Sequence, residues 1–372
     1  MAPARSTQVG LLAALAALAL VQRASALAAT PTHGRFVSPL FEDGYLAERV
    51  RPELPRLLYL PGFDGTLVAP FVQFPMLSDD YDIEGLASET EDRSTFAALV
   101  EEVTTHLLAE PIGRPLYLMG ESFGGILALS VALELARSGR PLAGLGLINP
   151  ATCYLESDLA LKAMAIIAKS DSSILPSVTY VQGVLSLLPL FGDRHMLPQI
   201  LQLVGGAKLP EVIDTPAREA YMGRVAFSLP CRLKFIPREA LRWRLEEWLA
   251  TGARHVQQRE MELCALTQPT VIVAGSADAA LPSVAEAQRL AALLPDACVH
   301  VVPGAGHAST CGIRVNLLAL LRSRFAGGGP TGAQRAPLGV APLAPELDPD
   351  LGLIPRPHPA VSPLAYWSTP GR

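Results

Sequence analysis

The hydrophobic positions of the chain fall into short continuous runs separated by longer amphipathic stretches. The runs, each closed by a nearby Gly or Pro, are Arg56–Leu60, Leu116–Met119, Leu145–Ile148, Thr270–Ala274 and Cys298–Val302. None of them alternates apolar with polar residues. The pattern therefore predicts strands that are buried on both faces, as in a parallel sheet covered by helices.

Helical patterns lie between these runs. Apolar residues recur at close to 3.6-residue spacing over Ser94–Leu108, and Phe123–Arg137 is apolar on nearly every side. A capping box at Ser283 is predicted to open a helix to about Leu294, and Gly312–Arg324 has the pattern of a last amphipathic helix. The alternation predicts an α/β fold with a mostly parallel sheet and helices on both faces.

Residues 151–268 interrupt this alternation, because they hold mostly helical patterns and no clear strand. The pattern therefore predicts a helical cap inserted between two late strands. The insertion contains long apolar runs at 163–168, 184–191 and 197–204. Helices this apolar either pack against the sheet or form a lid over an acyl-chain pocket, and the sequence leaves both interpretations open.

The two ends of the chain have compositions that are atypical of a folded domain. Residues 1–28 are predicted to be a signal or targeting segment. They contain an early positive charge, an unbroken apolar run over Val9–Val21 and small-residue cleavage patterns. The run is short for a bilayer span of about 20 residues, and an uncleaved anchor is the alternative. Residues 326–372 hold ten of the 33 prolines and are predicted to be a Pro/Gly-rich tail. The compact domain is therefore expected over 34–325.

Composition and charge exclude several classes of protein. Half of the 372 residues are hydrophobic, which supplies a sizeable core and excludes global disorder. The chain has 30 Lys and Arg residues and 35 Asp and Glu residues, so we expect no positive electrostatic field that would attract nucleic acid. The five cysteines are widely spaced without a CxxC pair. This predicts single buried thiols rather than a zinc knuckle or disulfide scaffold, and we expect no metal and no cofactor.

The most informative motif is Gly120-Glu121-Ser122-Phe123-Gly124, between the strand Leu116–Met119 and the apolar helix. GxSxG by itself is a weak signal, but a sharp strand-to-helix turn gives it a mechanism. Such a turn strains the serine, requires small neighbours and lifts the hydroxyl above the carboxyl edge of the sheet. Ser122 is therefore the candidate nucleophile, and the alternative is a surface serine in a glycine-rich turn.

A serine nucleophile needs a base, and His307 has the best placement of the seven histidines. It lies in a Gly-rich loop directly after the last predicted strand, so it reaches the same sheet edge as Ser122. Asp278 is the only acid in the loop after Thr270–Ala274, and the loop after Leu145–Ile148 has none. Serine, aspartate and histidine follow the chain order of an α/β-hydrolase triad. The alternatives are a surface-loop histidine and a turn or capping aspartate.

Two backbone N–H groups are expected to stabilise the oxyanion of an acyl-transfer reaction. One is that of Phe123, at the start of the apolar helix. The second candidate is that of Phe63, in the Gly-rich loop 61–66 after the strand Arg56–Leu60. Asp64 in this loop is predicted to have a structural role in an Asx-type turn, with a direct role near the substrate as the alternative.

Several segments spread over Phe36 to Phe325 carry a family resemblance: Phe36–Pro39, Leu57–Thr66, Gly120–Gly125, Asn149–Thr152, Gly275–Ser283 and Gly306-His307. In these segments the chain resembles the hydrolase half of the plant phytyl ester synthase family, the plastid esterase/lipase/thioesterase-type acyltransferases. The resemblance implies an α/β-hydrolase fold with Ser122, Asp278 and His307 as the catalytic triad. It also implies a plastid location and fatty acyl transfer to phytol or diacylglycerol, from donors such as galactolipid, acyl-CoA or acyl carrier protein.

Two features differ from the family pattern. Its members continue into a second, lysophospholipid-acyltransferase-like domain with an HxxxxD motif, and no histidine here has an aspartate five residues later. Residues 361–369 faintly resemble the start of that domain, so a truncated product and a hydrolase-only form are both open. The N-terminus has secretory character, which agrees with a route into a complex plastid, or alternatively with secretion or residence in the endoplasmic reticulum.

The sequence therefore predicts a serine-dependent esterase or acyltransferase that acts on lipid-like acyl esters through an acyl-serine intermediate. The expected partners are a hydrophobic acyl ester and an alcohol acceptor such as phytol or diacylglycerol. Peripheral association with a membrane or a lipid droplet is left open, and no nucleic acid is expected. The alternatives are a non-catalytic binding protein of the same fold and an inactive fragment that lacks its second acyltransferase domain.

Overall fold

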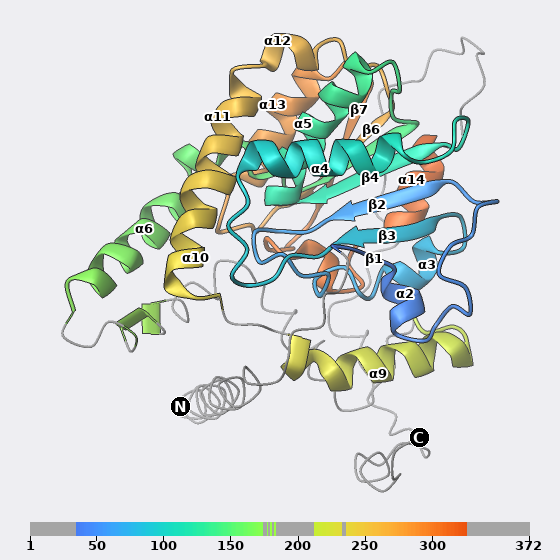
Figure 1. Cartoon of the computed structure of the whole chain (residues 1–372), viewed down its shortest axis with the longest axis horizontal. Coiled ribbons are helices and arrows are strands. Elements are labelled where there is room, and N and C mark those ends of the chain that lie inside the picture. The colour runs from blue at the N-terminus through green and yellow to red at the C-terminus, as the bar shows by residue number, and fades with distance from the viewer. Residues whose placement is uncertain are drawn as a thin grey trace, which may run out of the picture.

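In the part of the chain that the structure describes, seven strands form one sheet in the order β1-β3-β2-β4-β5-β6-β7, and each neighbouring pair is parallel except β1 with β3 (Figure 1). The computed structural model describes residues 35–173, 177, 179–180, 182–183, 212–232 and 236–325. The strands are β1 (Phe36–Val37), β2 (Arg56–Leu60), β3 (Asp82–Leu86), β4 (Leu116–Glu121), β5 (Gly144–Ile148), β6 (Thr270–Gly275) and β7 (Ala297–Val302). The five predicted strands are confirmed as β2 and β4 to β7.

Short and long helices connect the strands. Those outside the insertion are α2 (Pro39–Glu42), α3 (Phe74–Leu77), α4 (Phe96–Leu108), α5 (Phe123–Arg137), α13 (Ser283–Leu293), η3 (Ser309–Cys311) and α14 (Leu317–Phe325). Between β5 and β6, the described residues form η1 (Ala151–Glu156), α6 (Asp158–Asp171), α9 (Pro216–Arg232), α10 (Arg238–Trp243), η2 (Arg244–Thr251), α11 (Gly252–Gln257) and α12 (Glu260–Leu263). This confirms a helical insertion between two late strands.

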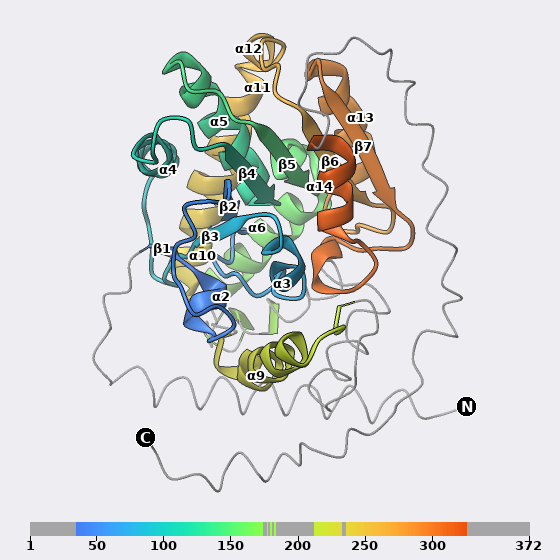
Figure 2. The same cartoon turned by 90° about the vertical axis from the view of Figure 1, so that its right-hand side faces the viewer.

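Alternate side chains of the strands enter two separate cores, one on each face of the sheet. In β2, Leu58 and Leu60 pack with α4 and α5, whereas Leu57 and Tyr59 pack with α3 and α14. Successive side chains of a strand point to opposite faces, so an uninterrupted apolar run feeds both cores. Figure 2 shows α4 on one side of the strands and α3 and α14 on the other.

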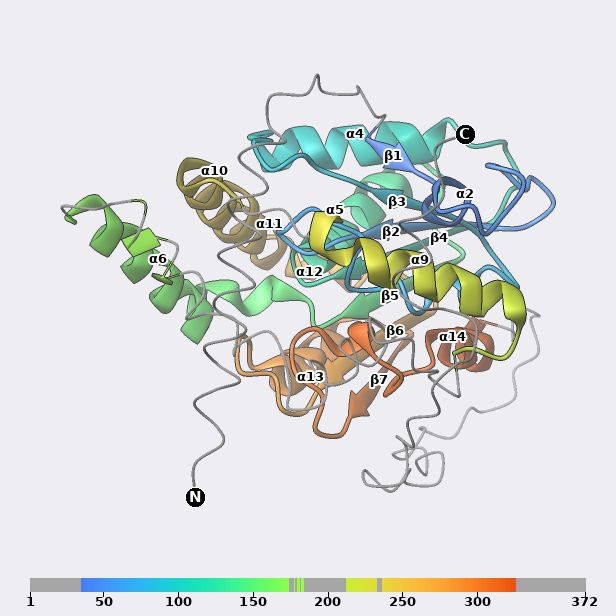
Figure 3. The same ribbon diagram turned by 90° about the horizontal axis from the view of Figure 1, so that it is seen from below.

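The helices of the insertion lie over different parts of this body. Helix α9 packs on the core that contains α3, through Tyr221, Met222 and Val225. Helix α6 extends away from the sheet beside α10 (Figure 3). Within the described residues, no helix combines the length and the apolar character needed to cross a membrane.

Four predicted segments lie outside the described residues. They are the signal or targeting segment 1–28, the tail 326–372 and, within the cap 151–268, the apolar runs 184–191 and 197–204. Their boundaries, and the choice between core packing and a lid, stay predictions.

Strands β1 and β3 are absent from the prediction, because β3 carries Asp82 and Glu84 and has no apolar run. Both acids are buried in the sheet. Asp82 accepts ion-pair contacts at 3.1 Å from Arg56 and at 2.7 Å from Arg114, and Glu84 lies 2.6 Å from His106. Buried charges of this kind are tolerated only when they are paired, and the partners lie far away in the sequence.

The predicted capping box at Ser283 is wrong. Pro282 occupies the N-cap position of α13, and no side chain caps this helix. The Ser283 hydroxyl instead donates to Asp278, and Glu286 binds Thr152 and Arg289. The nearby loop residue Asp278 therefore engages Ser283, and Arg289 together with the distant Thr152 engages Glu286, so neither side chain caps the helix.

Three further expectations need correction. The last helix begins at Leu317, five residues after the predicted Gly312, which lies in a loop. Strand β7 is an edge strand, so most of its residues are only half-buried. The buried-thiol prediction holds for Cys153, but Cys264 is exposed and two other described cysteines are half-buried, Cys298 and Cys311.

Candidate active site

Ser122 occupies the sharp turn between β4 and α5. Its backbone has φ 56° and ψ −115°, which is a strained conformation for a residue with a side chain. A Cβ atom on Gly120 would lie 2.1 Å from the carbonyl oxygen of Gly124, and one on Gly124 would lie 2.1 Å from that of Leu60. The strained turn predicted from the sequence is therefore present, and it depends on the glycines on either side of Ser122.

The structure brings Ser122, His307 and Asp278 into one hydrogen-bonded row. His307 Nε2 lies 2.9 Å from Ser122 Oγ, and His307 Nδ1 lies 2.8 Å from Asp278 Oδ2. The three residues follow the carboxyl ends of β4, β7 and β6, which meet at one edge of a parallel sheet. The Asp64 carboxylate accepts from the backbone N–H of Thr66 at 3.2 Å, as expected of an Asx-type turn.

Asp278 is held as an anion by a set of donors. One carboxylate oxygen accepts from the backbone N–H groups of Ala280 at 2.8 Å and Leu281 at 3.1 Å, and the other accepts from the Ser283 hydroxyl. Burial raises the pKa of this carboxyl, but the hydrogen bonds from His307, Ser283 and the backbone outweigh the burial and leave the pKa below its usual value. An anionic Asp278 fixes the ring orientation of His307.

Asn149, which no sequence pattern assigned to the site, anchors the loop that carries His307. Its amide nitrogen donates to the His307 carbonyl at 2.5 Å and to Ser309 Oγ at 3.1 Å, and its Oδ1 accepts from the Gly275 N–H at 2.8 Å. Asn149 has φ 42°, a conformation that asparagine adopts more readily than most residues. The only available signal in the sequence was an asparagine directly after a buried strand.

Glu121, the residue before Ser122, is a second buried group that the sequence analysis left unassigned. It accepts from the Tyr59 hydroxyl at 2.6 Å and from Thr310 Oγ1 at 2.9 Å. Burial raises the pKa of Glu121, although both hydrogen bonds act in the opposite direction. The contacts tie the Ser122 turn to the segment that follows His307.

The two candidate oxyanion residues lie next to Ser122. Phe123 is the first residue of α5 and directly follows Ser122. Phe63 belongs to a turn in which the Gly65 N–H donates to the Gly62 carbonyl at 2.9 Å, and Gly65 has φ 74°. A Cβ atom on Gly62 would lie 3.8 Å from the Cβ of Ser122, so this turn reaches the serine side chain.

A sequence profile of the alpha/beta hydrolase family matches residues 29–312. The chain belongs to this family. It is similar to phytyl ester synthase 1, chloroplastic, of Arabidopsis thaliana, with 28% identity over 277 residues, 73% of this chain and 37% of that protein. Phytyl ester synthase 2, chloroplastic, of the same plant is 30% identical over 202 residues, 52% of this chain and 27% of that protein. The chain thus aligns with well under half the length of these curated relatives.

A solved structure gives the same fold. MenH from S. aureus superposes with a TM-score of 0.50 at 17% identity, over 72% of this chain and 92% of that one. Family membership and this likeness confirm the predicted α/β-hydrolase fold. The two plant relatives confirm the resemblance to the phytyl ester synthases.

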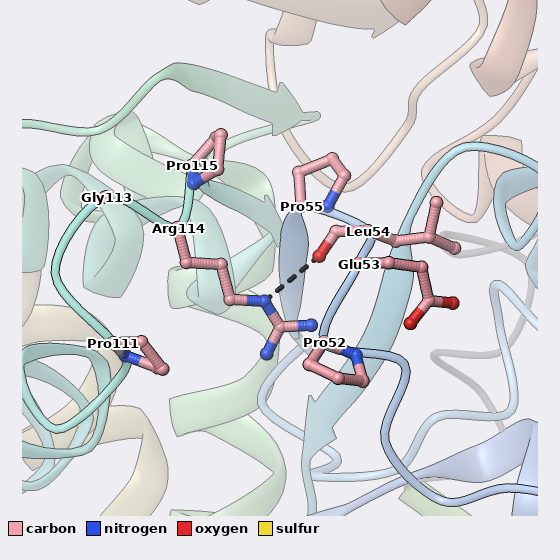
Figure 4. A pocket seen from close by; sticks show the side chains of 8 residues that line it. All are labelled: Pro52, Glu53, Leu54, Pro55, Pro111, Gly113, Arg114 and Pro115. Atoms are coloured by element: carbon pink, nitrogen blue, oxygen red, sulfur yellow. Dashed lines mark hydrogen bonds between the residues drawn. The ribbon is translucent and has the colours of Figure 1, made fainter.

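A hollow lies at the opposite, amino-terminal edge of the sheet, where Pro55 precedes β2 and Pro115 precedes β4 (Figure 4). It measures about 470 Å³ and is lined by Pro52, Glu53, Leu54, Pro55, Pro111, Gly113, Arg114 and Pro115. Arg114 already donates to the Leu54 carbonyl at 3.0 Å, to Glu110 at 2.8 Å and to Asp82 at 2.7 Å. The Arg114 charge at this hollow is therefore engaged within the protein, and Ser122 stays the candidate site. Among the described residues, no cluster of His, Cys, Asp and Glu has the arrangement of a metal site.

Proposed function

We propose that this α/β-hydrolase is a serine-dependent esterase or acyltransferase that acts on lipid-like acyl esters through an acyl-Ser122 intermediate. The observation that carries the proposal is the row of Asp278, His307 and Ser122, with contacts of 2.8 Å and 2.9 Å. The strained turn at Ser122 supports it, because such strain clusters at functional sites. Family membership and the two plant relatives support a hydrolase or acyltransferase in general terms.

In the first half-reaction, His307 Nε2 accepts the Ser122 proton while Oγ attacks the carbonyl carbon of the ester. Asp278 accepts the hydrogen bond from Nδ1 and stabilises the imidazolium. The N–H groups of Phe63 and Phe123 would stabilise the oxyanion of the tetrahedral intermediate. The imidazolium then returns the proton to the leaving oxygen, and the acyl group stays on Ser122.

In the second half-reaction, His307 takes a proton from water or from an alcohol, whose oxygen attacks the acyl-serine carbonyl. Collapse of the second tetrahedral intermediate releases an acid or a new ester, and Ser122 recovers its proton. Exclusion of water and an acceptor site would favour transfer over hydrolysis. The phytyl ester synthase relatives support phytol as an acceptor, and diacylglycerol is the second acceptor that we propose.

We also propose a plastid location, since both curated relatives are named as chloroplastic. We propose further that residues 1–28 are the signal segment that directs the chain there. We also propose that the insertion forms a lid, and that the protein associates peripherally with a membrane or a lipid droplet. The lid would shield a hydrophobic acyl chain above Ser122.

A fluorophosphonate probe tests the proposal directly, because it phosphonylates only an activated serine. We expect labelling of the wild-type protein and none of Ser122→Ala. Lipid profiling after incubation with mixed acyl donors, with and without phytol, then separates hydrolysis from transfer. A correctly folded wild-type protein that is not labelled would favour the non-catalytic binding protein or the inactive fragment.

A further inference from the structure

A polar and aromatic cluster of the insertion packs directly against both candidate oxyanion residues. The cluster belongs to η2, a π-helical segment that continues α10 without a break. π-Helical turns are rare in proteins, and many of those that occur lie at functional sites. Its two main side chains, Arg244 and Trp248, have exposed fractions of 0% and 1%.

Arg244 holds the backbone of the turn that contains Phe63. Its Nη1 donates to the carbonyl oxygens of Phe63 at 2.8 Å and Asp64 at 2.9 Å, and its Nη2 donates to the Glu89 carbonyl. A guanidinium is planar and presents its donors in a fixed geometry, so it fixes the orientation of the peptide groups that it binds. Arg244 therefore joins the turn to the chain that follows β3.

The N–H of Phe63 is oriented from the other side of the same turn. It shares a peptide group with the Gly62 carbonyl, which accepts from the Gly65 N–H at 2.9 Å. In a trans peptide the N–H and the C=O point in opposite directions, so this turn bond sets the direction of the Phe63 N–H. The Gly65 carbonyl also accepts from the Ser88 N–H at 2.9 Å, and Arg244 adds a restraint on this turn that comes from the insertion.

Trp248 holds the second candidate residue. Its ring stacks on that of Phe123 with a centroid distance of 5.0 Å and an interplanar angle of 17°. The Arg244 guanidinium lies 4.4 Å from the Trp248 ring centroid, and the indole N–H donates to the Ser94 carbonyl at 2.8 Å. Arg244, Trp248 and Phe123 thus form one continuous stack that ends beside Ser122.

We propose that Arg244 and Trp248 are positioning residues that hold the backbone N–H groups of Phe63 and Phe123 for stabilisation of the oxyanion. The inference rests on the proposed function, since it assumes a tetrahedral intermediate at Ser122. Oriented donors bind the developing oxyanion more strongly than the ground-state carbonyl. Loosening them should therefore lower kcat and leave KM nearly unchanged.

The test compares Arg244→Met, Arg244→Lys, Trp248→Leu and Trp248→Phe with the wild type. Hydrolysis of a medium-chain p-nitrophenyl ester gives kcat and KM, and an alkyl boronic acid, which forms a tetrahedral adduct on serine, reports transition-state binding. We expect Arg244→Met and Trp248→Leu to lower kcat about 10- to 100-fold with KM within about threefold of the wild type. The affinity for the boronic acid should fall in parallel with kcat. Arg244→Lys and Trp248→Phe should be affected less.

Arg218→Met is the matched control, because Arg218 is also buried and ion-paired but lies in α9. Its guanidinium contacts Asp79 at 2.8 Å and Asp214 at 3.0 Å. This control should lower the Tm and leave kcat unchanged. The proposal is overturned if Arg244→Met loses no more kcat than Arg218→Met, or if boronic acid affinity stays constant while kcat falls. If Arg244→Met fails to fold, the comparison of Arg244→Lys with Arg218→Lys tests the proposal by the same criteria. Absence of fluorophosphonate labelling of the wild type would instead refute the proposed function itself.

Discussion

Replacement of Asn149 by Ala should destabilise the fold and impair the site together, because one buried side chain supports both. Asn149 has an exposed fraction of 0%. Its side chain makes hydrogen bonds with the His307 carbonyl, the Ser309 hydroxyl and the Gly275 N–H, at 2.5, 3.1 and 2.8 Å. Alanine removes all three bonds and leaves three partner groups of a buried region without them.

The size of the effect follows from these contacts. A buried polar group that loses its partner costs about 1–3 kcal/mol, so three such groups should lower the free energy of unfolding by about 3–9 kcal/mol. The φ of 42° at this position adds roughly 1 kcal/mol against a residue without a polar side chain. At about 2 °C per kcal/mol for a domain of this size, the Tm should fall by at least about 8 °C. Because the His307 loop loses its anchor, kcat should fall about 100-fold.

Thermal unfolding and p-nitrophenyl ester hydrolysis, measured well below the Tm of the variant, check both parts. Ser130→Ala is the control, since Ser130 is equally buried but its hydroxyl donates only to the Ile126 carbonyl at 3.1 Å within α5. The control should cost about 1 kcal/mol and leave kcat unchanged. A Tm for Asn149→Ala equal to that of the control, or an unchanged kcat, would refute the assigned role of Asn149.

Four other variants test the remaining inferences. Ser122→Ala should lower kcat by a factor on the order of 10⁶ with an unchanged Tm, and more than a few per cent residual activity in a clean preparation would contradict the nucleophile assignment. Asp278→Asn should lower kcat about 10⁴-fold. Hydrogen bonds outweigh burial and hold the pKa of Asp278 below its usual value. The stabilising effect of the Asp278 carboxylate is therefore complete above about pH 4 and is lost as the pH falls through the folded pKa. The unfolding curves of the wild type and of Asp278→Asn should converge only in acid. Gly124→Ala should fail to fold stably, because its Cβ would lie 2.1 Å from the Leu60 carbonyl oxygen; a soluble variant with wild-type Tm would disprove this reading. A chain that ends at Phe325 should keep its esterase activity, and a Tm loss of more than about 4 °C would show that the tail packs on the core.

Local pattern alone was sufficient for most of the sheet and for the layout of the site. The apolar runs predicted β2 to the residue, and the apolar helix after Ser122 has the predicted bounds Phe123–Arg137. Ser122, Asp278 and His307 were predicted to meet because each lies in a loop directly after a parallel strand. The carboxyl ends of parallel strands share one edge of the sheet. The meeting of these three residues therefore follows from the positions of the strands along the chain, without knowledge of side-chain packing.

Only the tertiary structure identified the groups whose environment is made by distant partners. Strand β3 is stable because Arg56 and Arg114 pair with its buried acid Asp82. Glu286 accepts from Thr152, 134 positions earlier in the chain, instead of completing a capping box. Arg244 reaches the Phe63 turn from 181 positions further along the chain. A buried polar side chain is stable only with a partner of suitable geometry, and no local pattern of residue types carries the position of that partner. The sequence thus determined which residues line the sheet edge, and packing decided which buried side chains hold them there.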